Sequence, residues 1–371
     1  MEPVTHILTG ICLARTGLNR RAAYTTLAMA IAAELPDIDT LWGFAGPVAS
    51  FQHHRGITHT FIGLPVEAAL VVAAMYGLHR WRASRPNAHH ANHPLTAAPV
   101  CWGWLTVFVL LALLSHLFLD FTNNYGIRPF FPFNPHWYAG SITFIFDPLM
   151  FALLLGAAVL PALFRLVGSE VGSRRQAFAA RGWAISALLA LVVLWTFRET
   201  QHSRAITLAN AQSLAVPVET TPVADAQDTP SLNYLQPLRV LANPDPFNPF
   251  RWWMVTDYGP VYQLAQADTR NGTFKPAQQT TVKIAPSPEF QAAANSRLGR
   301  VYLDWSPMPF LSISHTEFDE AGQQVLAPGH TLVVFRDPRF MADLPGLRNR
   351  APLEGKVELD AQNRVVRETM N

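Results

Sequence analysis

Six apolar stretches separated by short polar loops occupy the first half of the chain. They cover residues 5–18, 22–35, 60–78, 100–121, 144–167 and 182–198. A helix needs roughly 20 apolar residues to cross a bilayer, so the last four are long enough, whereas the first two would have to tilt or be partly buried. The pattern predicts a mainly α polytopic membrane protein with about six membrane-embedded helices.

The pattern changes after residue 200. Residues 205–245 are rich in Pro, Ala, Thr and Gln, a composition typical of a linker or a loosely ordered segment. Further on, residues 300–305 and 331–335 have the β-branched and aromatic residues of strands, and residues 356–366 read as a hairpin. The predicted organisation is a helical membrane domain over 1–200, a linker over 201–250 and a β-rich extramembrane domain over 251–371.

The charge content agrees with this division. Only 15% of the residues are charged, against roughly 25% in an average soluble protein, and the three lysines all lie beyond residue 270. The net charge is +2 and no basic stripe is interleaved with aromatic residues, so we expect membrane lipid and no nucleic acid as a partner. The two cysteines, Cys12 and Cys101, are too few and too far apart for a disulfide framework.

Arginines occur in alternate loops. Three clusters lie between segments one and two, three and four, and five and six, at Arg15, Arg20 and Arg21, at Arg80, Arg82 and Arg85, and at Arg165, Arg174, Arg175 and Arg181. The positive-inside rule places these loops in the cytoplasm. Loops 36–59 and 122–143 and everything after residue 199 are then predicted to face outward from the cytoplasmic membrane.

The densest chemistry lies in residues 51–60, where His53, His54 and His59 stand directly before an apolar run. Neutral imidazole is a common ligand for zinc. Arg55 could clamp an anion, and a helix starting near Thr58 would direct its N-terminal dipole at the same place. The alternative is a polar loop whose histidines bind nothing.

Two further pairs of polar groups lie at the same outward-facing end of the predicted helices. Asp37 and Asp39 follow a proline, where they could share a cation or merely end a helix. His116 and Asp120 are four residues apart and therefore project from one helix face. A simple buried hydrogen bond between them is the alternative to a metal site.

Three single residues complete the candidates. His6 opens the first helix. Glu67 lies two turns beyond His59, where it could accept a hydrogen bond from a metal ligand, handle protons or only pack against another polar side chain. Asp147 precedes Pro148 and is best explained as a helix cap.

The motifs at this outward-facing end resemble those of a known family. His6, Pro36-Asp37-Ile38-Asp39, the string from His53 to His59, and the pair His116 and Asp120 are similar to the YdjM-type bacterial inner-membrane proteins over residues 1–200. The resemblance implies a metal-dependent hydrolase of the inner membrane. That family is in turn distantly similar to zinc-dependent phospholipases C and single-strand nucleases, helical proteins whose His and Asp ligands hold zinc and cleave phosphoesters.

The leading hypothesis is a membrane hydrolase that acts on an ester or phosphoester, with a lipid-like substrate, through water activated by zinc. The candidate ligands, too many for one tetrahedral ion, are His6, Asp37, Asp39, His53, His54, His59, His116 and Asp120. Arg55 and Thr58 would steady negative charge and Glu67 would handle protons. The alternatives are a transport or assembly protein that uses the cluster as a cation cavity, and a structural metal clasp.

Overall fold

The computed structural model describes residues 1–85, 94–170, 180–217, 232–317, 324–341 and 352–370. Arg174 and Arg175 of the third arginine cluster lie outside this part of the chain. The chain divides into two compact units. One contains residues 1–44 and 53–199, and the other contains residues 45–52 and 200–371. Each is described by itself.

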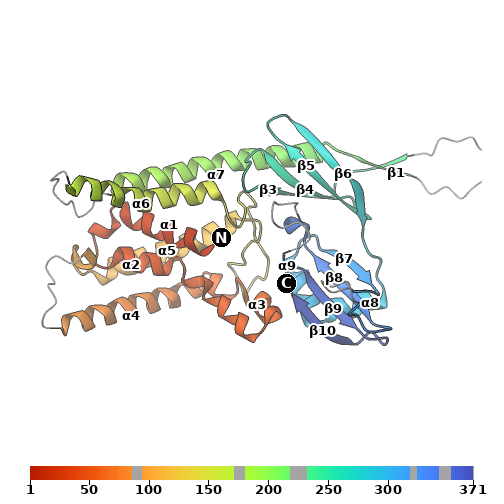
Figure 1. The fold of residues 1–371 in the computed structure, drawn as a ribbon, viewed down its shortest axis with the longest axis horizontal. Coiled ribbons are helices and arrows are strands. Elements are labelled where there is room, and N and C mark those ends of the chain that lie inside the picture. The colour runs from red at the N-terminus through yellow and green to blue at the C-terminus, as the bar shows by residue number, and fades with distance from the viewer. Residues whose placement is uncertain (86–93, 171–179, 218–231, 318–323, 342–351, 371) are drawn as a thin grey trace, which may run out of the picture. The chain divides into compact units, whose positions relative to one another are not determined.

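The first unit is a bundle of helices (Figure 1). Its main helices are α1 (Pro3–Arg15), α2 (Thr25–Ala32), α4 (Gly63–Ala83), α5 (Trp102–Thr122), α6 (Pro148–Glu170) and α7 (Arg181–Asn210). Helix α5 packs against α1, α2 and α4, and α1 also packs against α6. Among the described residues, buried apolar side chains gather in one cluster between α2, α4 and α5 and in another between α1, α6 and α7. The apolar runs of the sequence therefore form this core.

Helices α1 and α2 approach each other closely because Gly10 faces α2. A Cβ atom on Gly10 would lie 2.4 Å from the carbonyl oxygen of Met29, and Ala28 and Ala32 are fully buried. Small residues that let two backbones come together are typical of packing between membrane helices. The pair holds the segment after α2, which carries Asp37, beside α1.

The helices differ in their capacity to cross a membrane. Among the described residues, α5 and α7 are long and apolar enough, and a pair bent by 80°, residues 47–59 with α4, makes a third span if it is counted as one. Helices α1 and α2 have 13 and 8 residues. At 1.5 Å per residue they reach only about 20 and 12 Å, short of a hydrocarbon core of about 30 Å. The expectation of about six membrane-embedded helices is not confirmed.

The second unit contains the β-structure, so the prediction of a C-terminal β-rich domain is confirmed. An antiparallel sheet runs through β3 (Arg239–Pro244), β4 (Arg251–Asp257), β5 (Val261–Asp268) and β6 (Thr273–Val282). A second antiparallel sheet has the order β10-β9-β8-β7, with β7 (Phe310–Ser314), β8 (Thr331–Arg336), β9 (Gly355–Leu359) and β10 (Val365–Met370). Strands β1 (Leu214–Pro217) and β2 (Leu232–Leu235) form a separate pair. The predicted strand 331–335 and the predicted hairpin correspond to β8 and to β9 with β10.

The expectation of a strand at 300–305 is wrong, because these residues belong to helix α9 (Arg297–Trp305), which follows α8 (Pro288–Asn295). The side chain of Ser296 accepts a hydrogen bond from the backbone N–H of Gly299 and so caps α9. Tyr302 and Trp305 are buried on one helix face, where both rings contact Phe51 of the short helix α3 (Pro47–His53). The apolar face of this short helix carries the same β-branched and aromatic residue types that are typical of a strand.

Candidate metal centre

Four side chains from three separate segments converge in the helical unit. Asp37 lies in the 3₁₀ segment Leu35–Ala45, His59 in the 3₁₀ turn Ile57–His59, and His116 and Asp120 one turn apart on α5. One nitrogen or oxygen from each lies within 4.8 Å of the others. The His59, His116 and Asp120 side chains are fully buried, and that of Asp37 is 12% exposed. Asp37 is therefore the member of the group that solvent reaches.

The spacing of the four atoms suits a single small cation. His59 Nε2 lies 3.0 Å from His116 Nε2, 3.2 Å from Asp37 Oδ1 and 3.3 Å from Asp120 Oδ2. His116 Nε2 lies 3.7 and 3.5 Å from the same two oxygens. Ligands about 2.0–2.1 Å from a tetrahedral zinc ion stand about 3.3 Å from one another. The donor set and these separations therefore suit a small metal cation.

The hydrogen bonds behind the two imidazoles leave their Nε2 atoms free to bind. His116 Nδ1 lies 2.7 Å from the carbonyl oxygen of Ala33, which can only accept, so this nitrogen carries the proton. His59 Nδ1 lies 3.3 Å from Asp39 Oδ2 and 3.1 Å from Thr58 Oγ1. In both neutral rings the lone pair then lies on Nε2. A carbonyl or carboxylate behind the imidazole is the usual support of a metal-binding histidine.

Asp120 divides its two oxygens between different tasks. Oδ1 accepts a hydrogen bond from Nη2 of Arg55 at 2.8 Å and another from the amino group of Met1. Oδ2 has no hydrogen-bond partner among the described residues and points at the two imidazoles. An anionic oxygen buried without a donor is costly unless a cation neutralises it.

The charge of Asp37 is favoured by its neighbours. Burial alone would raise the pKa of Asp37, but a hydrogen bond from His59 and the positive charge of His116, which act when these rings carry a proton in place of a metal ion, outweigh burial. The pKa of this carboxyl therefore lies below its usual range, and Asp37 is anionic near neutral pH.

Asp39, expected as a ligand, lies behind His59. Its Oδ2 accepts a hydrogen bond of 2.6 Å from the backbone N–H of Arg55, and its Oδ1 lies 3.2 Å from His54 Nδ1. With His59 on the same carboxylate, Asp39 ties three residues of the histidine-rich segment together. The structure places it outside the group of four, where it supports the His59 ring.

The other three candidate histidines also lie outside the four. His6 stacks on His116 with ring centroids 3.8 Å apart, and its Nε2 is 3.4 Å from Asp120 Oδ1. His53 stacks on Trp42 at 4.0 Å. His54 meets the ring of Tyr125 edge-on at 5.2 Å. His6 is thus adjacent to the centre, while the contacts of His53 are with an exposed tryptophan.

Arg55 is buried, and its guanidinium group forms hydrogen bonds within the protein. Besides Asp120, its guanidinium donates to Gly126 O at 2.7 Å and to Asn123 Oδ1 at 3.2 Å. Its φ of +52° lies in the left-handed region that a non-glycine residue seldom adopts. These contacts hold Asp120 and the turn after α5 in place. A role for Arg55 in binding a substrate anion stays a prediction.

Thr58 and Glu67 lie on either side of the start of α4. The expectation that a helix starts near Thr58 is wrong, since residues 57–59 form a 3₁₀ turn and α4 begins at Gly63. Thr58 instead contacts His59 Nδ1 through its hydroxyl. Glu67 is buried, and neither of its carboxylate oxygens has a hydrogen-bond partner among the described residues.

Asp147 has the predicted role of a cap. Its Oδ1 accepts from the backbone N–H groups of Leu149 and Met150 at 3.1 Å, at the start of α6. Its other oxygen lies 2.7 Å from Nη2 of Arg198 on α7, and both side chains are buried. Asp147 therefore joins α6 to α7 and takes no part in the group of four.

Two contributors were not found from the sequence. Asn123 follows α5 and connects Arg55 to the turn after Asp120, and the order His116, Asp120, Asn123 at intervals of four and three residues was a signal for it. Ala33 contributes a backbone carbonyl oxygen, for which no side-chain motif exists.

Comparison with known proteins agrees with the resemblance of the motifs. The family model of the YdjM inner membrane protein matches residues 1–205. The uncharacterized protein YfhP of Bacillus subtilis (strain 168) is 27% identical over 165 residues, which cover 42% of this chain and 45% of that protein. No solved structure matches this chain. Since the matched residues make up more than half of the chain and contain every member of the centre, the chain belongs to the YdjM inner membrane protein family.

Proposed function

We propose that this protein is a membrane-bound, metal-dependent hydrolase of an ester or phosphoester in a lipid-like substrate. The observation that carries the proposal is the convergence of four lone-pair donors, Asp37, His59, His116 and Asp120, in a buried place without an opposing donor hydrogen. Imidazole with carboxylate suits zinc, although other divalent transition metals accept the same ligands. A zinc ion bound there would polarise a carbonyl or phosphoryl oxygen and lower the pKa of water.

The chain's own residues hold and shield this centre. Ala33 and Asp39 orient the two imidazoles, and Arg55 neutralises one oxygen of Asp120 while it fixes the carboxylate. The three buried ligands exclude water from one side, so substrate would approach past Asp37. Glu67 is a candidate to accept a proton near His59. The proposed orientation has the centre and the C-terminal unit on the outer side of the inner membrane.

A structural metal clasp is the second candidate, and one observation favours it. Four protein ligands complete a tetrahedral zinc site, as in structural centres, whereas catalytic centres usually have three and leave one position open. Access at Asp37 favours catalysis, because a carboxylate at the edge of a site is the ligand that a substrate can displace most easily.

Metal content decides whether the centre exists. We would purify the full chain in detergent, reconstitute it with zinc, manganese or iron, and compare it with His59→Ala/His116→Ala and with His53→Ala, whose ring stacks on Trp42 instead. The expected result is one metal per chain in the wild type and in His53→Ala, and none in the double variant. Metal-free wild type after reconstitution would overturn the proposal.

Turnover then separates hydrolase from clasp. The wild type should hydrolyse at least one member of a panel of carboxylic esters, phosphodiesters and phospholipids, and the metal-free double variant should not. Bound metal without turnover, together with loss of folding on chelation, would instead establish the clasp. Metal-dependent uptake of a cation into proteoliposomes would establish transport.

A further inference from the structure

A groove with an estimated volume of 470 Å³ opens beside the centre in the helical unit. Its apolar lining comes from α1, α2 and the segment after α2, namely Ile7, Ala30, Ile31, Leu35 and Ile38. Asp37 also lines it, so the groove reaches a ligand of the candidate metal centre directly. The volume lies within the roughly 300–1,000 Å³ that small-molecule sites occupy.

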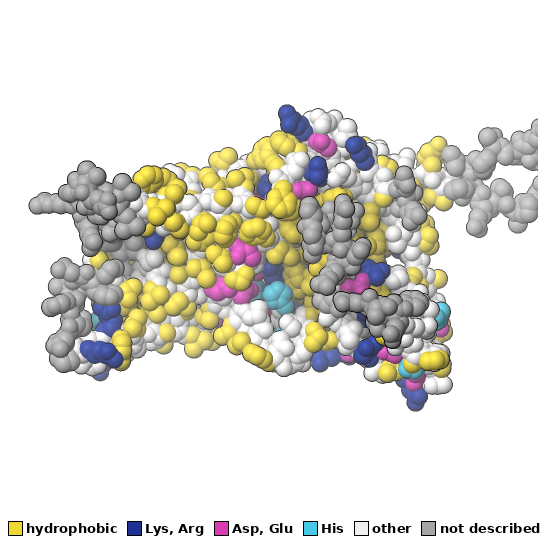
Figure 2. Space-filling view, in the orientation of Figure 1, with side chains coloured by type: hydrophobic (Ala, Val, Ile, Leu, Met, Phe, Trp, Pro, Cys, Tyr) yellow, Lys and Arg dark blue, Asp and Glu magenta, His cyan; other side chains and the backbone are white. Residues whose placement is uncertain are grey.

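The lining is apolar along most of its length and acidic at one place. Ile31 and Ile38 are 41% and 48% exposed. The two polar lining residues, Glu34 and Asp37, are both carboxylates, and no lining residue is a cation. Oε2 of Glu34 is buried and has no hydrogen-bond partner among the described residues. Figure 2 shows acidic side chains exposed among hydrophobic ones on one face of the helical unit.

This chemistry complements an amphiphile. An alkyl chain would cover the exposed isoleucines. Burial and the nearby charge of Asp37 raise the pKa of Glu34 to about 8, and a positively charged group with N–H donors would offset both effects and satisfy its unpartnered oxygen. Water cannot fill the apolar part favourably, and a ligand with a net negative charge would meet two acidic residues without an opposing cation. In a membrane protein, the abundant molecules with an alkyl chain and an ammonium group are aminolipids.

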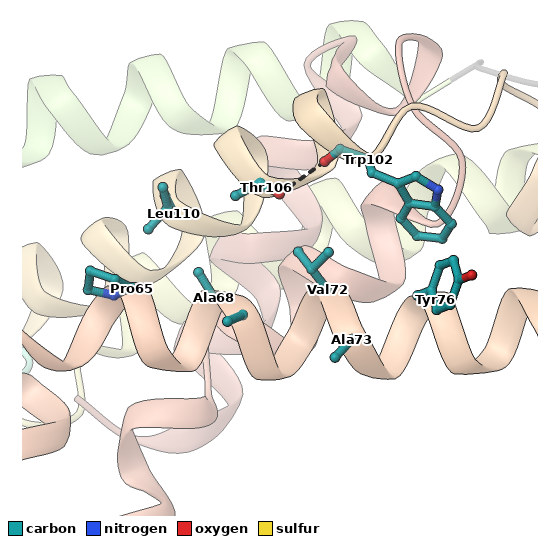
Figure 3. Close-up of a pocket in the computed structure, with 9 residues that line it drawn as sticks. Pro65, Ala68, Val72, Ala73, Tyr76, Trp102, Thr106 and Leu110 are labelled. Carbon is teal, nitrogen blue, oxygen red and sulfur yellow. Dashed lines mark hydrogen bonds between the residues drawn. The ribbon is translucent and has the colours of Figure 1, made fainter.

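A second groove in the same unit provides the comparison (Figure 3). It has an estimated volume of 530 Å³ between α4 and α5 and is lined by apolar side chains, with Tyr76 and Thr106 as its polar residues. The Thr106 hydroxyl already donates to the carbonyl oxygen of Trp102 at 3.0 Å. No carboxylate and no member of the metal centre lines this second groove. It has the shape for an alkyl chain without the chemistry for a headgroup.

We infer that the groove at Asp37 binds one acyl chain of a membrane lipid with a primary ammonium headgroup, with the ammonium at Glu34 and an ester at Asp37. This inference deepens the proposed function, on which it rests for turnover, by naming the substrate class. Binding itself requires only the groove.

Photolabelling tests the binding. The full chain would be reconstituted into nanodiscs that contain phosphatidylethanolamine with a diazirine on its acyl chain, irradiated, and mapped by mass spectrometry. Labels should lie on Ile7 and on residues 30–38. Ala30→Trp and Ile31→Trp, which fill the groove, should reduce this labelling about tenfold or more, the effect of losing a hydrophobic contact in a pocket. Ala73→Trp, which fills the second groove, should leave it unchanged.

Recognition of the headgroup is tested separately. A phosphatidylcholine probe with the same acyl chain lacks N–H donors, so it should label the groove less than phosphatidylethanolamine does. The difference should disappear in Glu34→Leu. Equal labelling by both lipids in the wild type would overturn the assignment of the ammonium to Glu34.

The outcomes for groove and hydrolase can be separated. Labelling that Ala30→Trp and Ile31→Trp leave unchanged, or that occurs only at α4 and α5, would overturn the groove even if a water-soluble short-chain ester is hydrolysed. Specific labelling without any turnover would support the groove and contradict the hydrolase. Thermal unfolding in detergent, measured on each variant, shows that the tryptophan variants are folded.

Discussion

The Nε2 atoms of His59 and His116 face each other at 3.0 Å in a fully buried place. With both Nδ1 atoms turned toward acceptors, neutral rings would bring two lone pairs together beside the carboxylates of Asp37 and Asp120. Such an arrangement is repulsive unless a cation lies between them, either a metal ion or a proton.

The support behind His59 can be weakened without removing a ligand. Asp39→Asn replaces an acceptor by an amide, which holds the Nδ1–H of His59 less firmly and loses a negative charge. We expect metal affinity to fall about 10- to 100-fold, as for other supports of metal-binding histidines. Competition with a chromogenic chelator would measure the change. The matched control is Asp360→Asn in the β9–β10 turn, and equal affinity in the two variants would contradict this role of Asp39.

Acidification should release the metal. Protons compete with metal for imidazole and carboxylate ligands, so occupancy should fall as the pH is lowered from about 8 to about 5. The pKa of Asp37 lies below its usual range, so its carboxylate stays anionic over this interval and the loss is expected at the histidines. Metal content after gel filtration at each pH would show the release. Occupancy independent of pH would argue against histidine ligands.

The ion pair between Asp147 and Arg198 should stabilise the packing of α6 on α7. Asp147→Asn keeps a capping side chain but leaves the Arg198 charge buried beside a neutral group. Removing one partner of a buried pair costs about 3–5 kcal/mol, so the thermal midpoint in detergent should fall. In Asp147→Asn/Arg198→Met the loss should be smaller than in Asp147→Asn, because the buried charge is removed together with its carboxylate. Additive effects of the two substitutions would rule out the coupling.

Gly10 should be required for the close approach of α1 and α2. Gly10→Ala places a Cβ atom 2.4 Å from the Met29 carbonyl oxygen, and relieving that overlap should cost about 1–3 kcal/mol of stability. Gly77→Ala on α4 meets nothing within 4 Å and should stabilise the protein by up to about 1 kcal/mol. Unfolding in detergent compares the two. A Gly10→Ala protein as stable as Gly77→Ala would show that the helices can separate freely.

Hydrophobic pattern and composition predicted the main division of the chain. The apolar, lysine-free half became helices and the remainder became mainly sheets with the short helices α8 and α9, because burial of apolar surface and β-propensity act locally on these residues. The number of membrane-spanning helices was predicted poorly. The pattern cannot show where a helix ends in space, and the first two segments form helices of only 13 and 8 residues.

The sequence by itself determined the family motifs and the pairing of His116 with Asp120, since a spacing of four residues fixes a common helix face. Only the tertiary structure decided which of eight candidate ligands meet. It brings together Asp37, His59, His116 and Asp120 from three segments, and it places Asp39 behind His59. The backbone carbonyl of Ala33 sets the tautomer of His116, and side-chain patterns carry no information about a backbone acceptor. Convergence of distant groups depends on how helices pack, which no local spacing encodes.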